Sequence, residues 1–179
     1  MWIGNPMQRC LLAGSLFLLL ACAPQNASRS DIDKPGIAWW YTIMFQPESK
    51  VTHDIEAGTI NKRWRYAHAL NLHDLKGRIS AGDIKQFQAS PLSFSISTDL
   101  DGDGVFEEFF VGVYEEGDGN SGRFVIITKN GIPVNYFTEG GSPGFSAVLR
   151  SGSEVRWYKC MECGEFESIR WTGQSYVIE

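Results

Sequence analysis

The segment 108–114, EFFVGVY, constrains the fold most, because it places apolar side chains on both faces of a β-strand. Aromatic and β-branched residues favour strands, and successive side chains of a strand point to opposite sides. A strand that is apolar on both faces has to be covered on both faces. We therefore expect this segment to be a central strand of a sheet, with a helix covering one side.

The chain from residue 92 to its end continues the strand-like pattern. Residues 123–128 and 132–138 flank Asn130-Gly131, a dipeptide typical of a type I′ hairpin turn, in which both central residues need positive φ. This half of the chain therefore predicts an antiparallel meander. Shorter strands are expected at 145–149, 154–158, 166–171 and 175–178.

The segment before residue 91 carries mainly helical signals. Apolar residues recur every three or four positions over 60–70, a spacing that favours an amphipathic helix. Ser80, with Asp83 three residues on, is typical of an N-cap, and it predicts a helix through Phe87. Two smaller elements are also expected, a strand at 39–45 and a helical turn at 72–76.

Together these segments predict an α+β fold, mainly an antiparallel β meander with short N-terminal helices, in a single domain over residues 37–179. Apolar residues make up 43% of the 179 residues and charged residues 21%, as in a globular protein. The net charge of −5 disfavours an extended surface for nucleic acid, so no nucleic-acid partner is expected.

The segment 99–107, DLDGDGVFE, is the one strong chemical motif. Its alternate carboxylates turn inward when the chain coils around a small cation, and Gly104 permits the sharp turn. Oxygen ligands in this number suit Ca²⁺, which is the expected cofactor. The predicted metal ligands are the side chains of Asp99, Asp101, Asp103 and Glu107 and the backbone carbonyl of Val105.

The surroundings of this motif strengthen the prediction. Residues 99–118 contain many acidic residues and no basic one, and such carboxylates repel one another unless a cation lies among them. A helical EF-hand needs Glu at its twelfth position, where Phe110 stands here in a predicted strand. The motif instead resembles the calcium loops of FG-GAP and VCBS-type repeats, as in integrin α-subunit propellers. The resemblance covers one loop, and a single copy does not imply a propeller. Calcium outside the cytoplasm is often millimolar, so a weak site suffices and we expect a structural ion and not a sensor.

Residues 1–21 have the pattern of an export signal. Arg9 precedes an uncharged apolar run that is too short to span a membrane as a helix. The run ends in Leu-Leu-Ala before Cys22, which resembles the lipobox of bacterial lipoproteins. The resemblance implies cleavage before Cys22, a diacylglycerol on its thiol and an acyl group such as palmitate on its amine. The alternative is an ordinary secretory signal cut near Ala21 or Ala23.

Residues 22–36 are predicted to be the lipidated Cys and a flexible tether, since they show no hydrophobic period. In Gram-negative lipoproteins, an Asp after the lipidated Cys commonly retains the protein at the inner membrane. Ala23 stands there instead, so the resemblance favours the outer membrane, on its periplasmic or surface face. The expected location is therefore the cell envelope, with the lipid as the contact to the membrane.

Cys160 and Cys163 are the cysteines that remain after Cys22. An oxidising compartment favours a disulfide between them. Zinc coordination and a redox-active pair of thiols are the alternatives, and a zinc site would need further ligands from elsewhere.

No residue is assigned a catalytic role. The segment 140–144 matches G-x-S-x-G, but Pro143 follows the serine and has no backbone N–H for an oxyanion hole. We therefore expect a non-catalytic binding, scaffolding or inhibitor module, with an envelope protein or a glycan as its partner. The alternative is an envelope hydrolase that uses carboxylates near the acidic loop.

Overall fold

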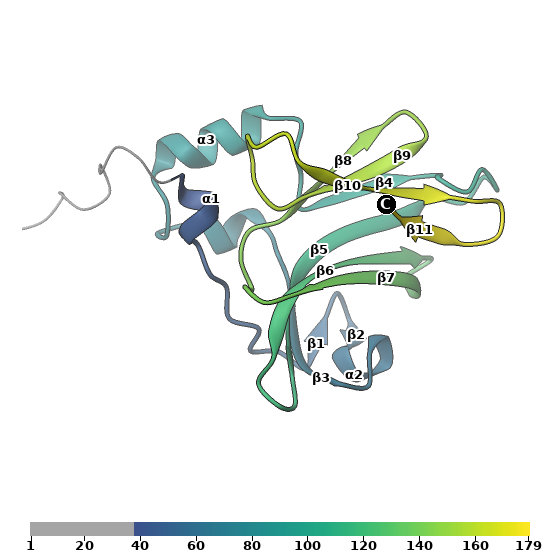
Figure 1. Ribbon diagram of the computed structural model, residues 1–179, viewed down its shortest axis with the longest axis horizontal. Helices are drawn as coiled ribbons and strands as arrows, with labels where there is room; N and C mark the ends of the chain where they lie inside the picture. The colour runs from purple at the N-terminus through teal and green to yellow at the C-terminus, as the bar shows by residue number, and fades with distance from the viewer. Residues whose placement is uncertain (1–37) are drawn as a thin grey trace, which may run out of the picture. The chain divides into compact units, whose positions relative to one another are not determined.

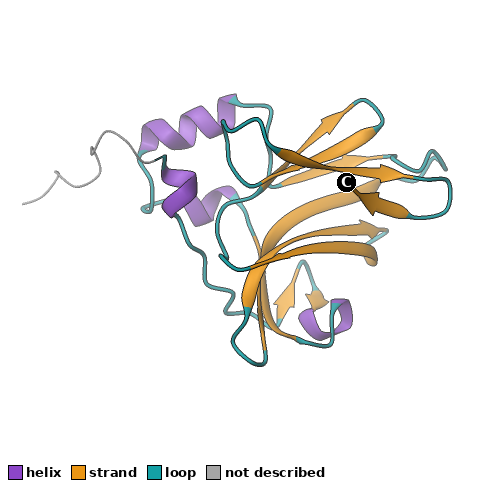
Figure 2. Cartoon of the chain, in the orientation of Figure 1, coloured by secondary structure: helices purple, strands orange, loops and turns teal. Residues whose placement is uncertain are grey.

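The computed structural model describes residues 38–179, which are mostly antiparallel β-sheet with a few short helices (Figures 1 and 2). The predicted export signal, Cys22 and the tether lie outside the described residues. None of the described helices is long and apolar enough to cross a membrane. In chain order the elements are α1 (Trp39–Thr42), β1 (Val51–Thr52), β2 (Ile55–Glu56), α2 (Ala57–Ile60), β3 (Trp64–Ala69), the 3₁₀-helix η1 (Leu72–Leu75), α3 (Ala81–Ala89), β4 (Ser95–Thr98), β5 (Glu107–Glu116), β6 (Ser121–Lys129), β7 (Ile132–Gly140), β8 (Ala147–Ser151), β9 (Glu154–Tyr158), β10 (Phe166–Trp171) and β11 (Tyr176–Ile178).

The two long strands β5 and β6 form the centre of a five-stranded sheet with the order β3-β5-β6-β7. β3 and β4 share the remaining edge of β5, β3 along residues 112–116 and β4 along residues 107–110. The last four strands form a second sheet in the order β11-β10-β9-β8. Ser93, just before β4, exchanges two backbone hydrogen bonds with Val148 of β8, so the two sheets are joined at this edge.

The main hydrophobic core contains residues of both large sheets. Phe109 and Val111 of β5 belong to it together with Trp157 of β9 and Ile169 of β10, and all four are fully buried. Phe87 of α3 belongs to the same cluster. Burial of this apolar area is the main favourable contribution to the stability of the domain.

A second cluster covers the opposite face of β5 and β6. Phe110 and Phe124 pack there with Trp64 of β3, and the segment from Ile55 to Ile60 completes the cluster. The apolar residues on both faces of β5 are therefore explained, but the expected helix is not the main cover. The second sheet covers the face of β5 that belongs to the main core. Short strands and the one-turn helix α2 cover the opposite face.

Most of the predicted C-terminal strands are confirmed within a few residues at their ends. Asn130 and Gly131 have φ of 53° and 75°, as the predicted turn requires. The N-cap is also confirmed, since the Ser80 side chain accepts a hydrogen bond from the Asp83 N–H at 3.1 Å and α3 begins at the next residue. η1 lies within the predicted turn at 72–76.

The helix predicted over 60–70 is wrong, because this segment contains the strand β3. The pairing of β3 with β5 is shifted between Trp64 and Tyr66 by a β-bulge. A bulge inserts one residue, so side chains that are three positions apart can face the same side. Trp64 and Ala67 are both buried as a result. The bulge therefore produces the same spacing as an amphipathic helix.

The strand predicted at 39–45 is also wrong over its first half, where the one-turn helix α1 is found. This turn buries Trp40 and lets Trp39 pack edge-on against Phe145, with the ring centroids 5.1 Å apart. Tyr41 is 65% exposed, whereas the alternation of a strand would have buried it with Ile43. Only the part after the turn is extended.

We predict that Gly112→Ala destabilises the domain by about 1–3 kcal/mol or more, because the close approach of β3 and β6 leaves no room for a methyl group. A Cβ there would lie 2.2 Å from Cζ of Phe124 and 2.3 Å from the carbonyl oxygen of His68. The matched control is Gly58→Ala in α2, where no atom lies within 4 Å. The midpoint of urea unfolding measures both, and equal midpoints would show that the packing at Gly112 is looser than described.

Candidate metal centre

The predicted calcium loop connects β4 to β5 and brings its four acidic side chains together. One oxygen atom from each of Asp99, Asp101, Asp103 and Glu107 lies within 4.8 Å of the others, so the group can hold a metal ion. Figure 1 shows this loop at the same end of the two sheets as the β6–β7 and β10–β11 turns. Whether the Val105 carbonyl serves as a further ligand stays a prediction.

The backbone of the loop holds these carboxylates in place. Asp99 accepts hydrogen bonds from the N–H groups of Gly102 and Gly104 at 2.8 and 3.0 Å. Asp103 accepts one from the Val105 N–H at 2.8 Å. Gly104 has a φ of 87°, which confirms that the sharp turn needs a glycine at this position.

Glu107 opens β5 and is the deepest residue of the cluster, with 0% of its surface exposed. Its Oε2 accepts a hydrogen bond from the Leu100 N–H at 2.7 Å. Its Oε1 is buried and accepts no well-directed hydrogen bond. A buried carboxylate oxygen of this kind is costly unless a cation faces it, and either an ammonium group or a metal ion can meet this need.

A cation that the acidic segment does not predict lies among these carboxylates, the ammonium group of Lys129. Its Nζ is 2.6 Å from Oδ2 of Asp101 and 2.8 Å from Oδ2 of Asp103. A third distance, 3.0 Å, joins Nζ to Oε1 of Glu107. Lys129 reaches the loop because it is the partner of Glu107 across β5 and β6. One ammonium neutralises one of the four negative charges.

The ion pairs change the acidity of both partners. Partial desolvation lowers the pKa of Lys129, but hydrogen bonds to Asp101 and Asp103 and the negative charge of Glu107 outweigh it, and the pKa rises above its usual range. The hydrogen bond from Lys129 lowers the pKa of Asp101 to about 2. A general acid at neutral pH needs a raised pKa instead. Asp101 is therefore better suited to binding a cation than to acid catalysis.

The loop also contacts the second sheet through Tyr176 of β11. The Tyr176 hydroxyl donates a hydrogen bond to Oδ2 of Asp101 at 3.3 Å, and burial raises the pKa of this hydroxyl. Its ring packs edge-on against Phe109 of β5, with the centroids 6.4 Å apart. Asp101 therefore contacts Lys129 of the first sheet and Tyr176 of the second, and the loop connects the two sheets at this end of the domain.

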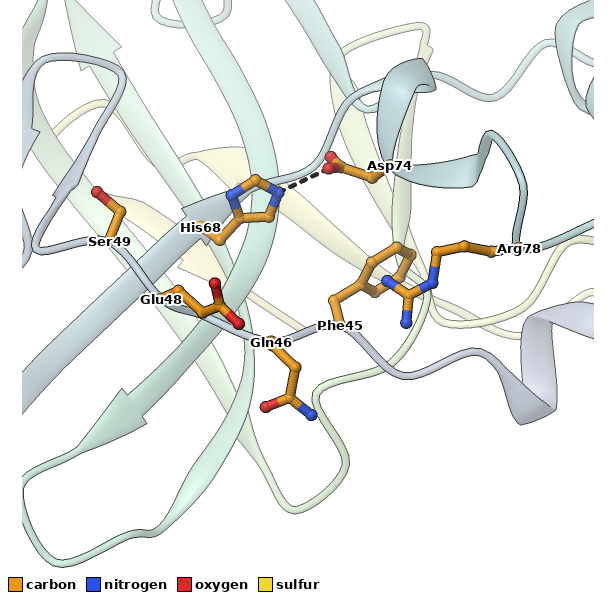
Figure 3. Close-up of a pocket in the computed structure, with 7 residues that line it drawn as sticks. All are labelled: Phe45, Gln46, Glu48, Ser49, His68, Asp74 and Arg78. Carbon is orange, nitrogen blue, oxygen red and sulfur yellow. Dashed lines mark ion pairs between the residues drawn. The ribbon is translucent and has the colours of Figure 1, made fainter.

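Another polar pocket, of about 500 Å³, contains an ion pair between Nε2 of His68 and Oδ1 of Asp74 at 2.9 Å. The sequence pattern does not predict this pair, because it favours a helix where β3 lies. The Ser49 hydroxyl donates to the Val51 carbonyl at 2.6 Å and points away from His68 (Figure 3). The pocket therefore holds no paired nucleophile and base. Its lining residues are Phe45, Gln46, Glu48, Ser49, His68, Asp74 and Arg78.

Cys160 and Cys163 form the predicted disulfide in the connection between β9 and β10, with their Cα atoms 5.9 Å apart. Cys160 is buried at 2% exposure and belongs to the main core.

Comparison of the chain with protein-family models, with curated proteins and with solved structures gives no match.

We predict that Asp101 makes the metal-free domain sensitive to acid. Its pKa in the folded state is about 2, below its ordinary value of 3.8. A carboxyl with a lowered folded pKa stabilises the protein above the unfolded pKa, and this contribution disappears as the pH falls through the folded pKa. In chelator, the unfolding free energy should therefore fall more steeply between pH 4 and 2 for wild type than for Asp101→Asn. Asp54→Asn, at an exposed turn, should behave as wild type, and parallel curves for all three proteins would contradict the Asp101–Lys129 pairing.

Proposed function

We propose that this protein is a lipid-anchored cell-envelope protein whose domain is a non-catalytic binding module with one structural Ca²⁺ site in the β4–β5 loop. The observation that carries the calcium site is the group of four carboxylate oxygens within 4.8 Å, faced by a single ammonium. The chemistry of the ligands supports calcium, because the group offers only oxygen and Ca²⁺ accepts many oxygen ligands in flexible geometry. The resemblance to FG-GAP and VCBS-type loops supports the same ion.

In this proposal Ca²⁺ displaces the ammonium of Lys129, since both cations require the same oxygens of Asp101, Asp103 and Glu107. The displacement lowers the affinity for the ion. Extracellular calcium modules commonly have a Kd of about 10⁻⁴–10⁻³ M, and millimolar calcium outside the cytoplasm fills most of a site whose Kd is about 10⁻⁴ M. Lys129 also explains why the metal-free loop can keep its shape. The ion is therefore structural, and no sensor role is proposed.

The lipid anchor is proposed from Cys22 and the residues around it, which match the lipobox and a tether. Several acyl chains on one residue anchor a protein stably, whereas a single chain binds a membrane only weakly. The domain would then act at a membrane surface, with outer-membrane location favoured by Ala23. An envelope protein or a glycan is the proposed class of partner.

We predict that the protein binds about one Ca²⁺ per chain and melts at a higher temperature in Ca²⁺ than in chelator, because binding to the native state adds RT ln(1 + [L]/Kd) to its stability. The double variant Asp101→Ala, Asp103→Ala should lose this difference. Calorimetric titration and thermal unfolding measure it. A wild-type melting temperature that does not respond to Ca²⁺ would rule out the calcium site.

Competition with Lys129 gives the second arm of this experiment. Lys129→Met should bind Ca²⁺ about tenfold more tightly or better, because the free site no longer has to release an ammonium. The same variant should melt lower than wild type in chelator, since its carboxylates then have no cation. Lys85→Met, at an exposed position of α3, is the matched control and should change neither value. Weaker Ca²⁺ binding in Lys129→Met would contradict the competition.

The anchor is tested by Cys22→Ser, which should give a soluble or unprocessed protein. Partition between detergent and aqueous phases after expression in a bacterium measures it, with Cys160→Ser as the cysteine control that keeps the lipid. A Cys22→Ser protein that stays in the detergent phase as processed wild type does would contradict lipidation.

A further inference from the structure

A cavity of about 310 Å³ lies beside the candidate metal centre and is lined by residues of both sheets. Lys129 and Asn135 line it from the first sheet, and Trp171, Gln174 and Tyr176 from the β10–β11 hairpin. Its volume lies at the lower end of the range for small-ligand sites. We propose that this cavity binds one or two rings of a neutral saccharide. The inference names the ligand class of the binding module proposed above and rests on that proposal.

An aromatic wall is the first feature that points to a sugar. Trp171 is half-buried, and its ring centroid lies 4.8 Å from that of the buried Tyr176, at an interplanar angle of 52°. Tyr176 in turn contacts Phe109 of the main core, so the indole of Trp171 packs against a side chain that the core holds in place. A rigid aromatic surface gives a large contact area at little cost in conformational entropy. The C–H face of a pyranose ring packs on such a surface.

Hydrogen-bonding groups surround this wall. Within residues 38–179 the side-chain amide of Gln174 has no hydrogen-bond partner, and Gln174 is exposed at the β10–β11 turn. The amide of Asn135 donates one hydrogen bond, to the Tyr176 carbonyl at 3.2 Å, and keeps a second N–H. A purely apolar ligand would leave these groups unpaired, which is unfavourable on burial. Hydroxyl groups can both donate to and accept from amides.

The charge of the cavity decides against ionic ligands. Asp101 and Lys129, the two charged residues that line it, are paired with each other at 2.6 Å. The four loop carboxylates outnumber the positive charge of Lys129, and also that of Lys129 together with one Ca²⁺, so this end of the cavity repels an anion with or without the metal. A cation would be attracted to the loop carboxylates instead of to the aromatic wall. A neutral ligand with one apolar face and many hydroxyl groups satisfies all of these features.

The test is an NMR titration of ¹⁵N-labelled full-length protein in detergent, with the indole N–H signal of Trp171 assigned from Trp171→Phe. The probes are chitotriose, cellotriose and maltotriose, each compared with glucuronate and with triglycine. At least one neutral trisaccharide should shift the Trp171 signal in a saturable way and more strongly than either comparison compound. Absence of any such shift, or tighter binding of glucuronate or triglycine, would overturn the proposal.

Two variants locate the binding. Trp171→Ala should weaken binding about tenfold, and Gln174→Ala, at an exposed turn where folding is not at risk, should weaken it severalfold. Tyr41→Ala, an exposed aromatic residue that does not line this cavity, should bind as wild type does. Binding that is unchanged in Gln174→Ala and in a folded Trp171→Ala would overturn the assignment.

Each titration is run in Ca²⁺ and in chelator. If the protein binds a saccharide but its stability does not respond to Ca²⁺, the proposed calcium site is wrong and the proposed saccharide site stands. If the protein responds to Ca²⁺ but binds no saccharide, only the saccharide site is wrong.

Discussion

Repulsion among the carboxylates of the β4–β5 loop is the constraint on which this end of the structure depends. Four acidic side chains converge within 4.8 Å, and one of them, Glu107, is completely buried at the start of the central strand. Such an arrangement persists only when backbone N–H groups and a cation compensate the charge. The loop supplies the N–H groups, and the paired strand β6 supplies Lys129. The register of the β5–β6 hairpin therefore determines which cation lies next to the loop carboxylates.

This compensation connects the site to the whole domain. Asp101 binds Lys129 from one sheet and Tyr176 from the other, and the ring of Tyr176 reaches the main core through Phe109. A cation bound by the loop would act on the contact between the sheets and on the wall of the neighbouring cavity. A structural ion and a ligand pocket at one end of the domain are thus compatible parts of a single binding surface.

The sequence predicts the C-terminal meander and the acidic cluster because both depend on local signals. The Asn130-Gly131 turn needs positive φ, and the spacing of the Asp residues follows from the coiling of nine residues around one point. β3 is not predicted, because a bulge gives Trp64 and Ala67 a helical spacing. Lys129 and Tyr176 are not predicted either, since both reach Asp101 only through the pairing and packing of distant strands. Lys129 could have been found by pairing β5 with β6 as a hairpin. A short turn between Glu116 and Ser121 fixes the register of the two strands, and in this register Lys129 lies opposite Glu107.

The central claim is that the carboxylate cluster is a cation site, with the ammonium of Lys129 as its internal occupant and Ca²⁺ as its competitor. The ¹⁵N signal of the Lys129 ammonium group, followed in metal-free protein and then during addition of Ca²⁺, tests this most directly. The account predicts an ammonium group whose protons exchange slowly with water in chelator, because it is hydrogen-bonded to Asp101 and Asp103 and faces the buried carboxylate of Glu107. Saturating Ca²⁺ should convert it to the fast exchange of an exposed lysine. An ammonium group that exchanges quickly without metal, or that does not respond to Ca²⁺, would contradict the account.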